Sequence, residues 1–337
     1  MANPVLAEVT RGDLVESVHR GSIAIADAEG RIVFALGDLE TPVYPRSSLK
    51  PVQALPLLES GAADAFDVSD EEVALACASH SGEPMHTTRV AAWLKRIGCS
   101  ESDLACGAQP SRYEPVAEDM IRCGEKPTRV HNNCSGKHTG FLTVARHWNI
   151  ATKSYERHDH PVQRAIAKAL GELTGISSEL PWGIDGCAAP NFAIPLAEQA
   201  RAFAKFAAPD SLPPERAKAC RRIVRAMIAH PELVSGTGRP CAILMRSCGG
   251  RAAVKIGAEG FYAGMIPERG LGIVLKIDDG ASRGAETAMA AILNKLGLLG
   301  GDRDAREILC APITNTRGEI TGERRPAPTL AKADIAV

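Results

Sequence analysis

Residues 251–277 read RAAVKIGAEGFYAGMIPERGLGIVLKI, three short apolar runs separated by turns that contain glycine. Apolar runs of this length, rich in branched side chains and bounded by glycine, are typical of β-strands joined by tight turns. We therefore expect consecutive antiparallel strands over 251–257, 261–265 and 271–277. The apolar run over 241–246 precedes them, and we expect a strand there too.

Before residue 240 the predicted secondary structure changes from strands to helices. Residues 5–9, 15–27 and 31–36 predict strands, with a turn at 28–30. Apolar residues then recur at helical spacing, which predicts helices over 48–58, 67–77, 85–97, 137–147, 161–173, 194–206 and 214–228, and a loop over 182–190. After the C-terminal strands we expect a helix over 284–296 and a hairpin around 319–322. Strands, helices and strands in this order predict an α+β fold.

In that fold a single antiparallel sheet is built from both chain ends, with the helices inserted between them. We expect one unit of 337 residues. Its sheet part takes about 1–60 and 240–337, and its helical part about 61–239.

Composition excludes several classes of partner. Lys and Arg number 39 and Asp and Glu 40, so the net charge of -1 gives no basic surface for nucleic acid or anionic membranes. No apolar segment approaches the length of about 18 residues that a membrane span needs. The N-terminus lacks the pattern of a signal peptide, so we expect a cytoplasmic protein whose ten cysteines are reduced thiols.

The first candidate for chemistry is the Ser-x-x-Lys motif formed by Ser47 and Lys50, in a proline-rich loop that leads into an expected helix. One helical turn brings side chains at this spacing together. A neutral Lys50 can then accept the proton as Ser47 attacks a carbonyl, and backbone N–H groups at the helix start can stabilise the oxyanion. By itself the spacing also fits a capping serine and a solvated lysine.

Three other polar side chains are candidates for the same chemistry. Ser79 and His80 lie in a loop directly after an apolar helix, where Ser79 can hydrogen-bond the reacting groups and His80 is equally suited to a structural role. Lys255 stands in an otherwise apolar strand. If it faces inward, its charge favours a neutral Lys50 or holds a carboxylate. The alternative is a solvated lysine on an edge strand.

Two cysteine-containing segments are candidates for a metal site. Cys134 and Lys137 lie three residues apart at an expected helix start, and Asp185 and Cys187 lie in a glycine-containing loop. Two thiolates suit zinc, whereas lysine binds a metal only after it loses a proton. Spacing alone leaves open whether these distant segments meet or contain unrelated buried cysteines.

Taken in order, these segments resemble the rhizobial-type (class 3) L-asparaginase family from about Val9 to Gly280. The motifs that carry the resemblance are RSSLKP at 46–51, CASHS at 77–81, NCSGKH at 133–138 and WGIDGC at 182–187, reinforced by HPELVSG at 230–236.

The resemblance implies a fold related to serine β-lactamases and glutaminases, and a homodimer that hydrolyses L-asparagine to L-aspartate and ammonia. It implies Ser47 as nucleophile, Lys50 as base, and a second Ser–Lys pair formed by Ser79 and Lys255. It also implies a zinc ion near the nucleophile, with ligands that map to Cys134, Lys137 and Cys187 and with Asp185 beside the metal. The substrate-binding residues that it suggests are Arg46, His80, Asp185 and Cys241.

Two other functions fit the same residues. A glutaminase or a penicillin-recognising serine hydrolase would use the same nucleophile, and a pocket discriminates one methylene by only about 1–3 kcal/mol. A non-enzymatic protein stabilised by zinc would use the cysteines alone, and replacing Ser47 would then affect no turnover.

Overall fold

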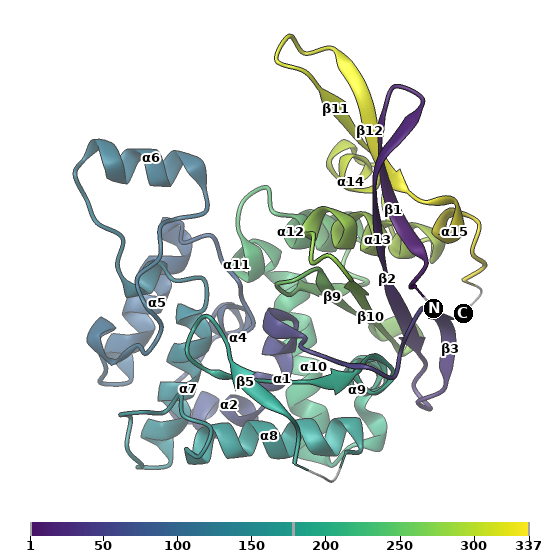
Figure 1. Cartoon of the computed structure of the whole chain (residues 1–337). Helices are drawn as coiled ribbons and strands as arrows, with labels where there is room; N and C mark the ends of the chain where they lie inside the picture. Colours follow the sequence, from purple (N-terminus) through teal and green to yellow (C-terminus); the bar gives the residue numbers. More distant parts are fainter. Residues whose placement is uncertain (1, 177–178, 336–337) are drawn as a thin grey trace. The chain divides into compact units, whose positions relative to one another are not determined.

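The structure is a computed structural model that describes residues 2–176 and 179–335. Its elements form two compact units, and Figure 1 labels many of the helices and strands. The first unit consists of the residues up to Ser48, residues 193–208 and the residues from Ile243 onward. The second consists of residues 49–192 and 209–242.

The first unit contains one eight-stranded antiparallel sheet. Its order is β11-β12-β1-β2-β10-β9-β8, and β3 pairs with β2 beside this path. The strands come from both ends of the chain, as predicted: β1 Val5–Arg11, β2 Leu14–Ala26, β3 Ile32–Leu36, β8 Ala253–Ile256, β9 Phe261–Ile266, β10 Leu271–Ile277, β11 Ala311–Thr314 and β12 Ile320–Pro326.

Shorter elements complete this unit. The short strands β4 and β7 pair with each other, apart from the main sheet. The elements are β4 Pro42–Val43, η1 Arg46–Leu49 (which ends in the second unit), β7 Ile194–Pro195, α9 Leu196–Ala207, η5 Pro267–Arg269, α13 Ser282–Lys295, α14 Arg303–Leu309 and α15 Pro328–Ala331.

Helices α9 and α13 cover opposite faces of the sheet. A Cβ on Gly272 of β10 would lie 2.1 Å from the nitrogen of Ala204 in α9, and a Cβ on Gly264 of β9 would lie 3.6 Å from Met289 in α13. Gly264 is the register partner of Ile273, the residue after Gly272. Since successive strand residues point to opposite faces, the two glycines admit helices on the two sides.

The second unit is mainly helical. Its elements are α1 Lys50–Gln53, α2 Leu55–Glu59, α3 Ala62–Ala65, α4 Asp70–Ala76, α5 Pro84–Arg96, η2 Glu101–Asp103, α6 Glu114–Arg122, η3 Arg129–His131, α7 Ser135–His147, α8 Pro161–Thr174, β5 Trp182–Ile184, β6 Pro190–Phe192, η4 Pro209–Ser211, α10 Pro214–Ala229, α11 Pro231–Ser235 and the start of α12 Pro240–Ser247.

Helix α7 is the core of the second unit. All its residues from Ser135 to Ala145 are buried, and it packs against α2, α3, α4 and α5. Helix α4 begins with a capping box, in which Ser69 accepts from the Glu72 N–H and Glu72 accepts from the Ser69 N–H. Helix α4 ends just before the loop that carries Ser79 and His80, and helix α7 begins directly after Cys134.

Several predicted elements need correction. Residues 241–246 belong to helix α12 rather than to a strand, because their burial repeats at positions i, i+1, i+3 and i+4, the period of a helix. The predicted loop over 182–190 contains β5 and the start of β6. The helix predicted from residue 194 begins at Leu196, and the C-terminal hairpin has longer strands than predicted.

Two further observations concern membrane-spanning helices and disulfides. Within residues 2–176 and 179–335, no helix combines the length and the apolar character that crossing a membrane requires. The ten cysteines all lie in the described residues, and they are present as thiols and not as disulfides.

Candidate active site

Ser47 lies in η1, directly before α1. Arg46, the residue before it, has a φ of 52°. A non-glycine residue in this left-handed region costs about 1–2 kcal/mol, and such strain tends to occur at functional sites. Ser47 is partly exposed, whereas the neighbouring Ser48 is fully buried and donates from Oγ to the Lys255 carbonyl at 2.7 Å. Of the two adjacent serines, Ser47 is therefore the more exposed one.

Lys255 lies beside the η1 segment in the first unit. It is fully buried although β8 is the last strand in the sheet order, and its Nζ donates to the Ile256 carbonyl at 2.7 Å. A Cβ on Gly257 would lie 2.3 Å from the Pro45 carbonyl oxygen. The glycine therefore lets the end of β8 approach the chain just before Ser47.

Lys50 meets Ser79 in the second unit. The Lys50 side chain is buried, and its Nζ donates to the Ala78 carbonyl and, at 3.0 Å, to Ser79 Oγ. The Ser79 N–H donates to the Val234 carbonyl at 2.9 Å, which fixes the loop that follows α4. The structure thus brings together two of the four residues predicted to be catalytic. Ser47 and Lys255 belong to the first unit.

His80 is held by the protein at both ring nitrogens. The Gly82 N–H donates to Nδ1 at 3.1 Å, so Nε2 carries the proton and donates to Ser135 Oγ at 2.9 Å. Burial, followed by the positive charges of His86 and Lys50, holds the pKa of His80 well below its ordinary value. The imidazole is neutral at physiological pH, and its predicted role in substrate binding stays a prediction.

The buried Glu83 carboxylate holds the same loop in place through three hydrogen bonds. Glu83 accepts hydrogen bonds from Ser81 Oγ at 2.5 Å and from the N–H and Oγ1 of Thr237 at 2.9 and 2.6 Å. Burial alone would raise the pKa of Glu83, but these hydrogen bonds outweigh it and lower the pKa below its ordinary value. Gly236 has a φ of 121°, and a Cβ there would lie 1.8 Å from Ser81 Oγ.

The thiols of Cys134 and Cys187 meet beside Lys137. Lys137 Nζ lies 2.9 Å from Cys187 Sγ, and the two sulfurs share a hydrogen bond. All three side chains are buried. The sequence left open whether these segments meet, and the structure brings them together.

The pKa values of the two thiols in this cluster are shifted in opposite directions. The hydrogen bond from Cys134 lowers the pKa of Cys187 to about 4, against burial and with help from the Lys137 charge. The same hydrogen bond, followed by burial, raises the pKa of Cys134 to about 12. Burial would lower the pKa of Lys137, but the adjacent thiolate outweighs it and raises the pKa. Without a metal, the cluster is therefore a buried thiolate–ammonium pair with a neutral thiol beside it.

The donor set fits zinc in kind, because two sulfurs and one amine nitrogen converge. A metal would have to displace protons from Cys134 and Lys137. No group of three or more His, Cys, Asp and Glu residues able to hold a metal ion occurs in the described part of the chain. The predicted ligand set contains only two residues of these types, Cys134 and Cys187, and Lys137 would be the third ligand.

One glycine explains why these loops lie side by side. Gly136 stands in the first turn of α7, where a Cβ would lie 2.4 Å from the Leu75 carbonyl oxygen of α4. The start of α7 can therefore touch the end of α4, and the His80 N–H donates to the Asn133 carbonyl at 3.2 Å. The close approach places Cys134 and Lys137 next to the loop that carries Ser79.

Two further predicted residues of the second unit are Asp185 and Cys241. Asp185 begins a tight turn in which the Ala188 N–H donates to its carbonyl at 2.8 Å, and its charge acts on Lys137. Cys241 is buried in α12. Sequence reasoning assigned no role to Glu83 or Thr237, and no local signal could have done so, because their contact spans 154 residues.

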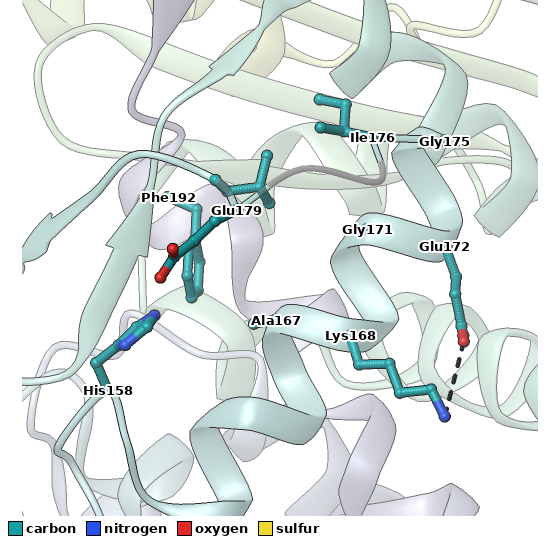
Figure 2. A pocket seen from close by; sticks show the side chains of 10 residues that line it. His158, Ala167, Lys168, Gly171, Glu172, Gly175, Ile176, Glu179 and Phe192 are labelled. Atoms are coloured by element: carbon teal, nitrogen blue, oxygen red, sulfur yellow. Dashed lines mark ion pairs between the residues drawn. The ribbon is translucent and has the colours of Figure 1, made fainter.

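The second unit also contains two cavities. One, of about 480 Å³, is shown in Figure 2 with His158, Phe192 and the ion pair between Lys168 and Glu172. The other, also about 480 Å³, adjoins Trp182 and shares His158. It is lined by Ile184 and Ala188, the chain neighbours of Asp185 and Cys187. No predicted site residue lines either cavity, so neither is the candidate active site.

Comparisons with known proteins give one family match. Residues 7–326 match the family model described as L-asparaginase II. No curated protein matches the sequence.

The solved structures that match have low similarity. The native form of Mglu has a TM-score of 0.48 and 14% identity over 85% of this chain, which spans only 66% of the Mglu chain. A β-lactamase from Mycobacterium bovis has a TM-score of 0.44 and 13% identity over 82% of this chain and 94% of its own. The octameric penicillin-binding protein homologue from Pyrococcus abyssi has a TM-score of 0.39 and 12% identity, over 86% of this chain and 75% of its own.

Proposed function

The chain belongs to the L-asparaginase II family, a family of amidohydrolases, and we propose on that premise that it hydrolyses L-asparagine to L-aspartate and ammonia with Ser47 as nucleophile. The observation that carries the proposal is the buried amine of Lys50, three residues after Ser47, which donates to Ser79 Oγ at 3.0 Å. A buried lysine beside hydroxyl groups is the arrangement that a Ser–Lys hydrolase requires.

In the first half of the reaction, Ser47 Oγ attacks the side-chain amide carbonyl of asparagine and its proton passes to Lys50 Nζ, which accepts it after releasing its own proton. The oxyanion of the tetrahedral intermediate is stabilised by backbone N–H groups at the start of η1 and α1, an effect worth about 2.7–4 kcal/mol per donor in other enzymes. The C–N bond then breaks, and the leaving nitrogen takes a proton to depart as ammonia.

Ser79 is the relay for that proton in our proposal, because its hydroxyl is hydrogen-bonded to Lys50. Lys255 is the second relay candidate, and its carbonyl holds Ser48 beside the nucleophile. In the second half, water attacks the aspartyl ester at Ser47, Lys50 accepts the water proton, and Ser47 leaves protonated. The products are aspartate and the free enzyme.

We propose Cys134, Lys137 and Cys187 as the ligands of a zinc ion near this site. When bound, zinc would supply a fixed charge that orients the substrate and the surrounding side chains. Activation of water is assigned to Lys50, since the serine already acts as nucleophile. A chelator that abolished turnover while leaving folding and substrate binding intact would overturn this division of roles.

Ammonia release from L-asparagine, L-glutamine and a chromogenic β-lactam tests the function. We expect the wild type to release ammonia from L-asparagine and Ser47→Ala, with an unchanged far-UV spectrum, to lose it by about three orders of magnitude or more. Ser48→Ala is the matched control and should keep most of the activity. Turnover of glutamine or the β-lactam instead of asparagine would refute the substrate assignment, and an active Ser47→Ala would refute the nucleophile.

A further inference from the structure

One contact between an amine and a thiol joins the first turn of α7 to the loop before β6. Lys137 Nζ lies 2.9 Å from Cys187 Sγ, and both side chains are buried within the second unit. All residues of α7 from Ser135 to Ala145 are buried, so close packing holds the Lys137 amine in this position. A nucleophilic nitrogen is therefore kept within bonding reach of an oxidisable sulfur.

The loop around Cys187 fixes the sulfur as well. The Asp185 N–H donates to the Ala189 carbonyl at 2.9 Å, and the Ala188 N–H donates to the Asp185 carbonyl at 2.8 Å. Ala188 has a φ of 73°, which a residue other than glycine adopts only where its surroundings impose it. The turn therefore holds Cys187 Sγ beside Lys137 Nζ.

A small oxidant can approach this contact from the side of the loop. The residues on either side of Cys187, Gly186 and Ala188, are exposed, and Cys187 itself is 5% exposed. Ile184 and Ala188 line a cavity of about 480 Å³. A thiol next to a lysine and close to the surface has the surroundings typical of oxidation-sensitive cysteines.

We propose that hydrogen peroxide joins Cys187 Sγ to Lys137 Nζ through a sulfur–nitrogen bond, a sulfenamide, in the zinc-free chain. The Cys187 thiolate attacks one peroxide oxygen, so that an S–O bond forms, the O–O bond breaks and hydroxide leaves. The hydroxide takes a proton from the Lys137 ammonium and becomes water. The resulting amine attacks the sulfenic sulfur, and the S–O bond breaks as the oxygen leaves with one amine proton as a second water. The sulfur loses two electrons, and the peroxide gains them.

The bridge removes two of the three donor atoms in the proposed zinc ligand set. A sulfenamide sulfur carries no thiolate charge, and thiolate is the form in which cysteine binds zinc. The oxidised chain therefore loses its zinc site, and zinc that is already bound protects both atoms from peroxide. The bridge does not depend on the proposed hydrolysis of asparagine, whereas its effect on zinc rests on the proposed ligand set.

Peptide mapping of the whole chain tests the bridge. Protein treated with a chelator is exposed to a few equivalents of hydrogen peroxide, free thiols are alkylated in denaturant, and the chain is cut after acidic residues. We expect the peptide that contains Lys137 to be joined to the one that contains Cys187, with the loss of two hydrogen atoms. Dithiothreitol should separate the two peptides, because a thiolate attacks the sulfur of the bridge.

Two variants distinguish this bond from a disulfide between Cys134 and Cys187. Cys134→Ser should form the bridge as the wild type does. Lys137→Arg in the Cys134→Ser background should abolish it and leave a sulfenic acid at Cys187 that dimedone labels. Cys310→Ser removes an exposed thiol, and this matched control should behave as the wild type.

Zinc added before the peroxide should leave the peptides unjoined, and the oxidised chain should take up zinc only after dithiothreitol. A bond between Cys134 and Cys187 in the wild type, an oxygen atom retained between sulfur and nitrogen, or an unmodified Cys187 would overturn the proposal. A bridge that forms equally fast with zinc present would refute its link to the metal, and it would leave the assignment of the hydrolase activity untouched.

Discussion

Replacing Gly236 with alanine should destabilise the second unit and loosen the loop that carries Ser79. Gly236 has φ 121° and ψ 169°, a conformation that is almost confined to glycine. A Cβ at this position would lie 1.8 Å from Ser81 Oγ and 2.8 Å from Glu83 Oε1. The new methyl group would therefore push on the residues that brace the loop from Ser81 to Glu83.

The expected size of the effect has two parts. The unfavourable backbone conformation costs about 1–3 kcal/mol, and overpacking of a buried site costs about 1–3 kcal/mol. We therefore expect Gly236→Ala to lower the free energy of unfolding by about 2–6 kcal/mol. That is a large part of the total of about 5–15 kcal/mol that typical domains have.

Gly238 provides a matched control. It also has a positive φ, 67°, but a Cβ there would meet no atom within 4 Å. Gly238→Ala should therefore cost only the backbone part, about 1–2 kcal/mol. Guanidinium chloride unfolding, followed by circular dichroism at fixed pH and protein concentration, measures both variants against the wild type.

Ser81→Ala should restore part of the stability in the Gly236→Ala background, because it removes the atom at 1.8 Å. Equal unfolding midpoints for Gly236→Ala and Gly238→Ala would refute the close contact between the two loops. An unaltered cost in the double variant would show that the strain arises from the backbone alone.

Three further predictions concern stability and metal content. Ser69→Ala removes the hydrogen bond to the Glu72 N–H at 3.3 Å, and urea unfolding should show a loss of about 1 kcal/mol; an unchanged midpoint would contradict the cap. Burial would raise the pKa of Asp70, but the Arg222 guanidinium outweighs burial and lowers the pKa. The stability that this ion pair contributes is therefore complete above the unfolded pKa of about 3.9, and it is lost as the pH falls through the folded value. Asp70→Asn should therefore flatten the acid side of the stability profile, and a profile as steep as that of the wild type would contradict this pairing. We expect metal analysis to find zinc in the wild type and to find it lost in Cys134→Ser, whereas retention of stoichiometric zinc by the variant would remove this thiol from the ligand set.

The sheet was predictable because its strands carry local signals. Residues 251–277 contain three apolar runs, each ended by a glycine-containing turn, and each forms a strand. The run over 241–246 has no such punctuation, and a short apolar run fits a helix or a strand equally well. Pro240 in the first turn was the available indication that this run is helical.

The site was predictable only where its residues are neighbours in the sequence or resemble a known motif. The contact between Lys137 and Cys187 spans 50 residues, and the motifs named both residues without showing that they meet. The bracing of Glu83 by Thr237 has no local signature, because it depends on how α5 and α11 pack. The homodimer and the cytoplasmic location stay predictions from the sequence.

The central claim is that Ser47 forms a covalent ester with the aspartyl group of the substrate. Acid quenching of the enzyme during steady-state turnover of L-asparagine, followed by proteolysis and mass spectrometry, tests it directly. We predict one added aspartyl group on the peptide that contains Ser47, absent in Ser47→Ala and in unreacted enzyme. An aspartyl group found on another peptide, such as the one that contains Ser79, or rapid turnover by a folded Ser47→Ala, would contradict the account.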